Sequence, residues 1–150
     1  MNTVAIRSLK AFELARAIAQ GDISAREALQ ASIDRIESTD AAINAFTGKS
    51  YPRARVEADA VDRQRARGET LPVLAGVPYA VKNLFDISGE VTLAGSKINQ
   101  RHASASQDAA LVQQMHHAGA VLVGSLNMDE YAYGFTTENT HYGPSHNPHD

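Results

Sequence analysis

Residues 76–99 read GVPYAVKNLFDISGEVTLAGSKIN and contain the segment that decides the fold. A strand over 77–82 would carry apolar side chains on both faces, so it is predicted to be buried in a parallel sheet. Lys82 closes this run, although a lysine is almost never fully buried unless it is paired. Taken alone, this favours an ammonium that reaches solvent at the strand end. The alternative is an environment that changes the charge of Lys82, which is how an enzyme makes a lysine into a base.

A second apolar run at 120–123 predicts another buried strand, which we expect Gly124 to end. Between the two runs, residues 108–118 predict a helix. A strand, a crossover containing a helix and a second buried strand indicate an α/β protein with parallel strands. Residues 136–150, rich in Gly, Pro, Asn and His, predict an irregular loop. Because two strands do not make a self-supporting sheet, we expect the chain to be unfinished.

The first seventy residues predict helices. Ser8 is placed to cap a first helix that ends near Gly21, and 24–27 has the pattern of a capping box for a second helix. A turn and short link are expected over 39–46, before a third helix over 52–68 that has proline in its first turn. The residues expected on the apolar faces of the first two helices are Leu9, Phe12, Ala15, Ile18, Ala28, Leu29, Ile33 and Ile36.

Composition excludes several classes of protein. The 150 residues include 14 Lys plus Arg and 17 Asp plus Glu, and the net charge of −3 gives no electrostatic reason to expect direct binding of nucleic acid. The absence of cysteine removes a cysteine nucleophile, a thiolate zinc site and disulfides. No apolar segment fits a signal peptide or a membrane span. We therefore expect a cytoplasmic protein with no membrane association.

Two polar clusters are expected to be structural. Asp129 and Glu130 could form a carboxylate pair, but adjacent side chains point apart and these residues favour a helix N-terminus. His141, His146 and His149 lie close in sequence, yet prolines interrupt any helix through them and no HExxH motif is present. We therefore expect no metal site. Phosphate-cradling loops and a GxSxG nucleophile elbow are also missing from the sequence.

Four ordered motifs carry a resemblance to a known family. The sequence has GVPYAVKN, TLAGSKIN, AGAVLVGSLNMDEY and TTENTHYGPSHNPHD, in the order in which the amidase signature family has GxPxxVKD, TxxGS, AGAxxxGKTNMDEF and STENxxxGPxxNPWD. The match covers roughly half of the chain. It implies an amidase-signature α/β fold, in which a mixed, mostly parallel sheet is covered by helices. Residues 1–70 would be an N-terminal helical segment, and 71–150 the start of the α/β core of the same domain.

The resemblance also implies a catalytic triad of a lysine, a serine in a cis peptide and a nucleophilic serine. Lys82 falls on the catalytic lysine and would be the general base. Both serines belong to a Gly/Ser-rich segment that we expect beyond Asp150. An unperturbed lysine has a pKa near 10.4, so action as a base near pH 7 requires that pKa to fall by about three, which corresponds to roughly 4 kcal/mol. Burial can supply an effect of that size.

One residue departs from the family pattern. Asn83 stands where the family usually has an aspartate directly after the lysine. Loss of that carboxylate makes it easier to keep Lys82 neutral, but leaves open whether the hydrogen bond that the aspartate would accept is replaced. Another stretch matches the family's substrate entrance, although its aromatic residues could equally belong to the core. This stretch consists of Tyr133, Gly134, Phe135 and Thr136.

Within the family, VKNLFD, LAGSKIN and MDEYAYGFTTEN resemble the carboxybiuret hydrolases of cyanuric acid catabolism. This resemblance implies hydrolysis of an amide-like C–N bond in a small urea-type substrate such as 1-carboxybiuret, without a cofactor. It also implies a hetero-oligomer with a small helical accessory subunit. The alternative of the same class is the A subunit of a glutamine-dependent tRNA amidotransferase. The alternative of another class is a non-catalytic scaffold or binding protein that retains the fold.

Overall fold

The computed structural model describes residue 6 and residues 8–149. Residues 1–5 and 7, part of the stretch in which we predict no signal peptide, and Asp150, at the end of the predicted loop, lie outside that range. The chain divides into two compact units, and the predicted organisation with a boundary near residue 70 stays a prediction. The first unit is Met1–Glu37, Ser50–Tyr79 and Gln114–Val123, and the second is Ser38–Lys49, Ala80–Gln113 and Gly124–Asp150.

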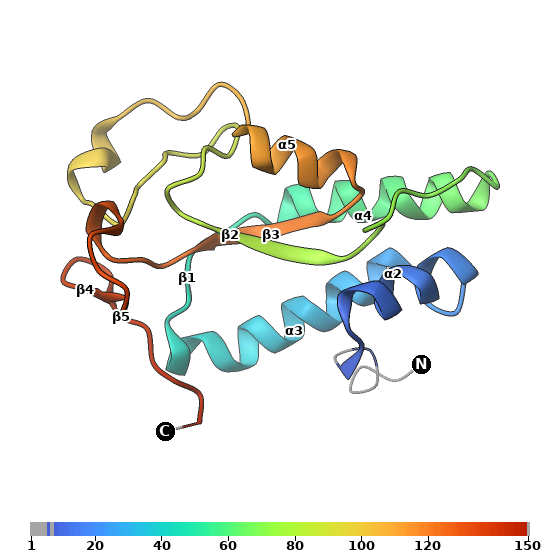
Figure 1. The fold of residues 1–150 in the computed structure, drawn as a ribbon, viewed down its shortest axis with the longest axis horizontal. Coiled ribbons are helices and arrows are strands. Elements are labelled where there is room, and N and C mark those ends of the chain that lie inside the picture. Colours follow the sequence, from blue (N-terminus) through green and yellow to red (C-terminus); the bar gives the residue numbers. More distant parts are fainter. Residues whose placement is uncertain (1–5, 7, 150) are drawn as a thin grey trace. The chain divides into compact units, whose positions relative to one another are not determined.

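Helix α2 (Ala11–Gln20) and the first part of α3 (Ala25–Ile43) form a helical hairpin in the first unit (Figure 1). As predicted, α2 ends at Gly21, which adopts the left-handed conformation with φ 82°. Its N-cap is Lys10 instead of the predicted Ser8. Phe12, expected on the apolar face, is 67% exposed, whereas Ile18 is completely buried. The apolar stripe of α2 is therefore narrower than its sequence indicates.

The predicted capping box of α3 is confirmed. The Ser24 backbone N–H donates to Glu27 Oε2 at 2.8 Å, and the Glu27 N–H donates to Ser24 Oγ at 3.0 Å. Helix α3 then runs through the turn predicted at 39–40. The carboxylate of Asp40 accepts the N–H groups of Ala45 and Phe46, at 2.9 and 3.1 Å, so it stabilises the backbone beyond the helix instead of ending the helix.

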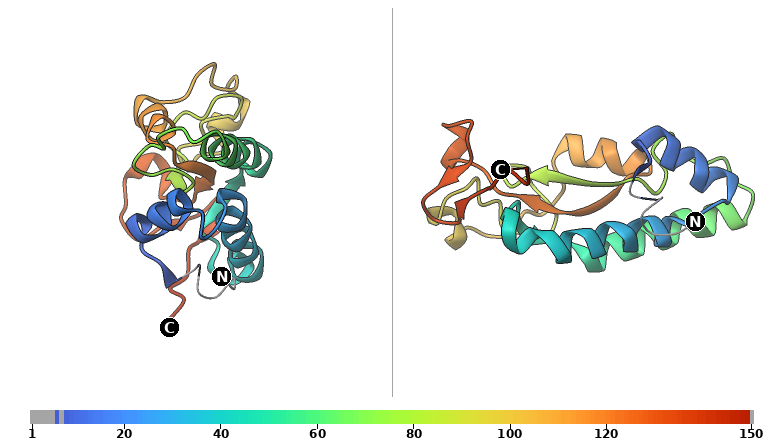
Figure 2. Two further views of the ribbon diagram at one scale, coloured as in Figure 1. Left: turned by 90° about the vertical axis from the view of Figure 1, so that its right-hand side faces the viewer. Right: turned by 90° about the horizontal axis from the view of Figure 1, so that it is seen from below.

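Helix α4 (Tyr51–Ala66) matches the predicted third helix, with proline in its first turn. It lies beside α3 in the first unit (Figure 2). The carboxylate of Asp62 on α4 accepts the N–H groups of Ala25 and Arg26, at 2.8 and 3.1 Å. Asp62 therefore satisfies two of the unpaired donors at the start of α3, which ties the helices together.

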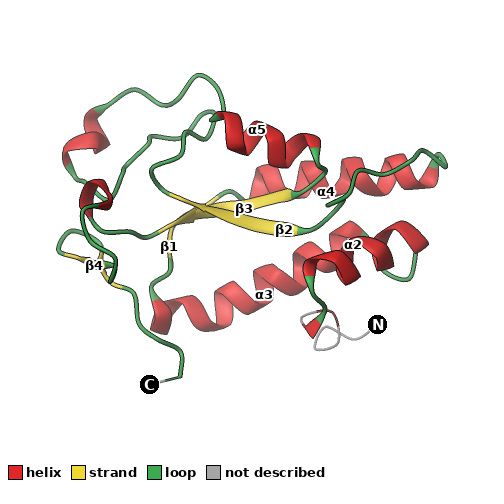
Figure 3. Ribbon diagram, in the orientation of Figure 1, coloured by secondary structure: helices red, strands yellow, loops and turns green. Residues whose placement is uncertain are grey.

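The sheet has the strand order β1–β3–β2 (Figure 3). Strand β1 (Phe46–Lys49), which begins at the last residue of the predicted link and was not predicted, pairs antiparallel with β3 (Val121–Leu126). Two hydrogen bonds join β2 (Pro78–Lys82) to β3. The Val121 N–H donates to the Val77 carbonyl, and the Asn83 N–H donates to the Leu126 carbonyl. The residue numbers of the bonded pairs therefore increase in the same direction along both strands. Strands β2 and β3 are therefore parallel. The prediction of an α/β fold with a mixed sheet is confirmed.

Strand β3 is the buried centre of this sheet. Residues 121–125 are all buried, and the strand continues through Gly124, which we predicted would end it. A Cβ atom on Gly124 would lie 2.2 Å from the Gly48 carbonyl oxygen, so the glycine allows β1 to approach β3. The predicted helix between the strands is α5 (Ala110–His117).

Short elements interrupt the long connections of the second unit. These are the 3₁₀ turns η1 (Ile98–Arg101) and η2 (Glu130–Ala132) and the strands β4 (Glu138–Asn139) and β5 (Gly143–Pro144). Strands β4 and β5 form a small antiparallel hairpin inside the loop predicted for 136–150. Across residue 6 and residues 8–149, we find no helix with the length and hydropathy needed to cross a membrane.

Candidate active site

Lys82 is the last residue of β2, and its side chain is exposed. The preceding strand residues are only half-buried, so the predicted burial of this strand on both faces is wrong. The cause is its place in the sheet, because β2 is an edge strand of the part of the chain that the structure describes, whereas β3 has a strand on each side. Lys82 therefore stands at a strand end with its side chain open to solvent.

Asn83, the next residue, is buried, with 3% of its surface exposed, and both ends of its side-chain amide are hydrogen-bonded. Its side-chain oxygen accepts the Gly95 N–H at 2.9 Å, and its side-chain nitrogen donates to Thr47 Oγ1 at 2.9 Å. Its backbone N–H donates to Leu126, and its carbonyl accepts the Ala94 N–H. The question raised by the missing aspartate is thereby answered, because the asparagine oxygen accepts the Gly95 N–H.

Gly95 lies where two backbone segments approach each other. It has φ 70°, and a Cβ atom there would lie 2.9 Å from both the Met128 carbonyl oxygen and Asn139 Nδ2. The buried amide of Asn139 donates to the Gly95 and Met128 carbonyls, at 2.7 Å each. Asn139 therefore fastens the turn after β2 to the segment after β3.

Asp129 anchors the loop that contains the predicted substrate entrance. Its two carboxylate oxygens accept the N–H groups of Thr137 and Glu138, at 2.9 and 3.0 Å. Gly134 packs against the same carboxylate, since a Cβ atom there would lie 2.8 Å from Asp129 Cγ. The structural role predicted for Asp129 is correct, but the expected cause, a helix dipole, is wrong, because η2 has only three residues.

The loop presents its aromatic side chains to solvent. Tyr133 and Phe135 are each 98% exposed, so neither ring is packed in the core of the part of the chain that the structure describes. Tyr131 and Ala132 have positive φ angles of 51° and 58°, which are costly for residues with a Cβ atom. Asp129 therefore holds a strained backbone that projects two aromatic rings outward. The role of the loop at a substrate entrance stays a prediction.

Glu130 belongs to a neighbouring polar cluster. A hydrogen bond from the Ser96 side chain, aided by the nearby His141, lowers the pKa of the Glu130 carboxyl. The His141 Nε2 atom lies 3.3 Å from Glu130 Oε1. The Ser96 hydroxyl is completely buried and also accepts the Ile98 N–H, so it supports the turn and is not exposed to a substrate.

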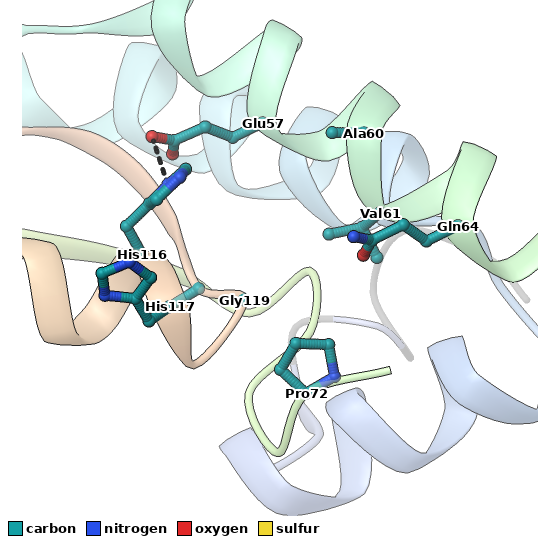
Figure 4. A pocket seen from close by; sticks show the side chains of 9 residues that line it. Glu57, Ala60, Val61, Gln64, Pro72, His116, His117 and Gly119 are labelled. Carbon is teal, nitrogen blue, oxygen red and sulfur yellow. Dashed lines mark ion pairs between the residues drawn. The ribbon is translucent and has the colours of Figure 1, made fainter. Parts of the chain in front are cut away.

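The first unit contains a separate pocket next to helix α4 (Figure 4). Glu57 at its wall accepts the Leu122 N–H of β3 at 2.9 Å and forms ion pairs with Arg53 and His116. Its wall contains none of the predicted site residues. Strand β1 pairs with β3 only from residue 124 onward. At Leu122 the Glu57 carboxylate therefore accepts the N–H that a neighbouring strand would otherwise accept. The lining residues are Glu57, Ala60, Val61, Gln64, Pro72, His116, His117, Gly119 and Ala120.

Histidines 141, 146 and 149 do not form a metal centre with carboxylates. Within residue 6 and residues 8–149, no group of three or more His, Asp or Glu side chains is arranged to hold a metal ion. Sequence reasoning missed Thr47, Asn139 and the anchoring role of Asp129. Asn139 lies inside the TTEN motif quoted for the resemblance, and this was the only signal in the sequence that marked it.

Comparison with known proteins settles the family. A profile of the family described as Amidase matches residues 27–150, which include Lys82 and every residue of the networks around it. The chain belongs to this family. A solved structure of a vestigial protein complex, described as revealing the evolutionary origins of an s-triazine catabolic enzyme, is similar with a TM-score of 0.94 and 61% identity. The similarity covers 95% of this chain and 31% of that one. A solved bacterial aryl acylamidase of the amidase signature family is similar with a TM-score of 0.88 and 33% identity, over 95% of this chain and 30% of that one, and confirms the amidase-signature fold.

Two curated relatives carry more specific names. The AtzE subunit of 1-carboxybiuret hydrolase from Pseudomonas sp. (strain ADP) is 61% identical over 142 residues, which are 95% of this chain and 31% of that protein. The A subunit of the glutamyl-tRNA(Gln) amidotransferase from Anaeromyxobacter sp. (strain K) is 45% identical over 138 residues, 92% of this chain and 28% of that protein. The amidase chain described here thus spans about 30% of the length of these relatives.

Proposed function

We propose that the protein is an amidohydrolase that cleaves an amide-like C–N bond in a small urea-type substrate such as 1-carboxybiuret. The observation that carries this proposal is the 61% identity with the carboxybiuret hydrolase subunit over 95% of the chain. Membership of the amidase family supports the reaction class, and the higher identity with AtzE than with the amidotransferase subunit supports the substrate class.

In the proposed mechanism, neutral Lys82 is the general base. It takes the proton of a serine in a cis peptide as that serine takes the proton of the nucleophilic serine, a Ser–Lys variant of the usual triad. The nucleophile attacks the carbonyl carbon, and backbone N–H groups stabilise the oxyanion. Collapse of the adduct breaks the C–N bond, and the proton held on Lys82 returns through the relay to the leaving nitrogen. Water then hydrolyses the acyl-enzyme by the same proton route.

The exposure of Lys82 within this chain matters for this proposal. Lys82 lies exposed at the end of β2, so a further segment of the protein can reach its amine. We therefore propose that the segment carrying the two serines covers Lys82 when the active site is assembled. Both serines would come from the Gly/Ser-rich segment that the family resemblance implies.

Replacement of Lys82 tests the proposal. In the complete enzyme, Lys82→Ala is expected to lower kcat for 1-carboxybiuret by about 10²- to 10⁴-fold, the contribution of a positioned general base. Lys97→Ala, which removes another exposed lysine of the second unit, is the matched control and keeps kcat. Near-normal turnover by a folded Lys82→Ala enzyme would remove the central claim.

The 45% identity with the amidotransferase relative supports a second candidate. Release of ammonia from glutamine, together with co-purification of a tRNA-binding subunit, would favour that function over hydrolysis of a urea-type substrate. The scaffold alternative expects turnover of neither substrate. A side-by-side assay of the complete protein with 1-carboxybiuret and glutamine therefore separates all three functions.

We also propose that the protein assembles with a small helical subunit in the cytoplasm and needs no cofactor. The solved relative is described as a protein complex, which supports assembly. Affinity purification of the tagged protein from its native host should recover one small partner at a fixed ratio. A single species with the mass of the protein alone, measured by light scattering, would contradict the hetero-oligomer.

A further inference from the structure

The residue next to Lys82 is more heavily bonded than a turn requires. Both functional groups of the Asn83 side chain and both groups of its backbone form hydrogen bonds. These bonds reach three separate pieces of the second unit: β1, the 94–95 turn and the end of β3. Thr47 is the contact on β1, and Leu126 is the contact on β3.

The orientation of the Asn83 amide follows from its partners. The Gly95 N–H can only donate, so the side-chain oxygen must face it and the nitrogen must face Thr47 Oγ1. The Thr47 hydroxyl then accepts from Asn83 and points its own hydrogen toward the Ser125 carbonyl, 3.5 Å away. Asn83 thus donates to Thr47 on β1, and Thr47 in turn donates to Ser125 on β3.

Burial links this network to the lysine. Asn83 is 3% exposed, whereas the neighbouring Lys82 is exposed. Because the two residues are adjacent, the hydrogen bonds that hold the Asn83 side chain in the interior also fix the direction in which the Lys82 side chain points. Consecutive Cα atoms are only about 3.8 Å apart, so a shift of Asn83 is passed to Lys82 almost undiminished. The Lys82 carbonyl also accepts the Phe85 N–H, which fixes the other side of the turn.

We propose that Asn83 is a positioning residue for Lys82. Its amide fastens the end of β2 to the 94–95 turn and to β1, and thereby holds the lysine where the segment that carries the two serines meets it. This inference rests on the proposed role of Lys82 as the base. Asn83 itself does not exchange a proton with the substrate.

Three variants of the complete enzyme test the proposal, with kcat for 1-carboxybiuret measured at the pH optimum of each. Asn83→Leu keeps the shape but leaves the Gly95 N–H and the Thr47 hydroxyl without this partner, and should lower kcat by about 10- to 100-fold. Asn83→Asp keeps the acceptor for Gly95, and the Thr47 hydroxyl can donate to it, so kcat should return to within a few-fold of the wild type. Thr47→Val removes one bond and should cause an intermediate loss.

Asp62→Ala is the matched control. It removes a side chain of the first unit that, like that of Asn83, forms two hydrogen bonds, in this case with two backbone N–H groups. It should therefore lower the melting temperature without changing kcat per folded molecule. If Asn83→Leu behaves in this way too, the residue is merely structural and the proposal falls. It also falls if Asn83→Asp is as slow as Asn83→Leu. If Asn83→Leu does not fold, a wild-type kcat in Thr47→Val overturns it.

The Lys82→Ala enzyme separates the two claims. An inactive Lys82→Ala variant beside a fully active, folded Asn83→Leu variant would refute only the positioning role. An active Lys82→Ala variant would refute the proposed function itself, whatever the Asn83 variants do.

Discussion

The close approach of β1 to β3 makes Gly124→Ala a sharp test of the sheet. Real Cβ atoms essentially never come within 3.0 Å of such neighbours, yet here the new methyl would lie 2.2 Å from the Gly48 oxygen. Strand β1 must therefore move away from β3 by about 1 Å at the paired residues. Overpacking costs about 1–3 kcal/mol, and each stretched hydrogen bond adds about 1 kcal/mol. We expect the free energy of unfolding to fall by at least about 3 kcal/mol.

Urea unfolding measures this loss, and hydrogen exchange of the β1 amides shows where it occurs. Gly68→Ala is the control, because its Cβ atom would meet nothing within 4 Å. Its φ of 71° makes alanine strained, so it should cost about 1–2 kcal/mol without changing exchange in β1. The reasoning is refuted if Gly124→Ala costs no more than this control, or if β1 keeps its protection.

Three further outcomes follow from individual contacts. Glu57→Ala leaves the buried Leu122 N–H without its acceptor and should lower the free energy of unfolding in urea by about 1–3 kcal/mol. Glu57→Gln keeps an acceptor and should recover most of that free energy. Equal losses in the two variants would contradict this role. Gly134→Ala drives a methyl against the anchoring carboxylate of Asp129, so KM in the steady-state assay should rise several-fold. An unaltered KM would count against the loop as a substrate entrance. The Ser24 backbone N–H, and then its hydroxyl, lower the pKa of the Glu27 carboxyl, so its stabilisation is complete above the unfolded pKa of about 4.3 and is lost as pH falls through the folded pKa. Glu27→Gln should therefore reduce the difference between urea midpoints at pH 7 and pH 3, and an unchanged difference would refute this assignment.

The sequence predicted those elements whose signals are local. The capping box at Ser24, the glycine after α2 and the apolar run of β3 each act within a few residues, and all three are in place. Helix α3 overran its predicted end because the Asp40 carboxylate bonds to N–H groups beyond the helix, where residue preferences alone do not locate its partners. Strand β1 was missed because FTGK has neither an alternating nor a fully apolar pattern.

The remaining differences depend on contacts between distant residues. The burial of β2 was overpredicted because an apolar run gives no indication of whether its strand lies at an edge. Lys82 could be chosen from its unusual place and the motifs around it, but the bonds that hold Asn83 join residues 36 and 12 positions away in the chain. Gly95 lies in the quoted motif TLAGSKIN, but nothing in the sequence pairs it or Thr47 with Asn83.

The two bonds accepted by Asp129 have a consequence for how this part of the molecule can change. The Asp129 side chain, just before the segment, bonds to residues 137 and 138, just after it. Residues 130–136 therefore form a loop whose two ends are held together by contacts that do not involve its tip. Substitution of Tyr133 or Phe135 should therefore leave the position of the sheet residues unchanged. If the predicted role of this loop at the substrate entrance holds, substitutions at its tip can change the substrate while its attachment to the rest of the unit stays the same.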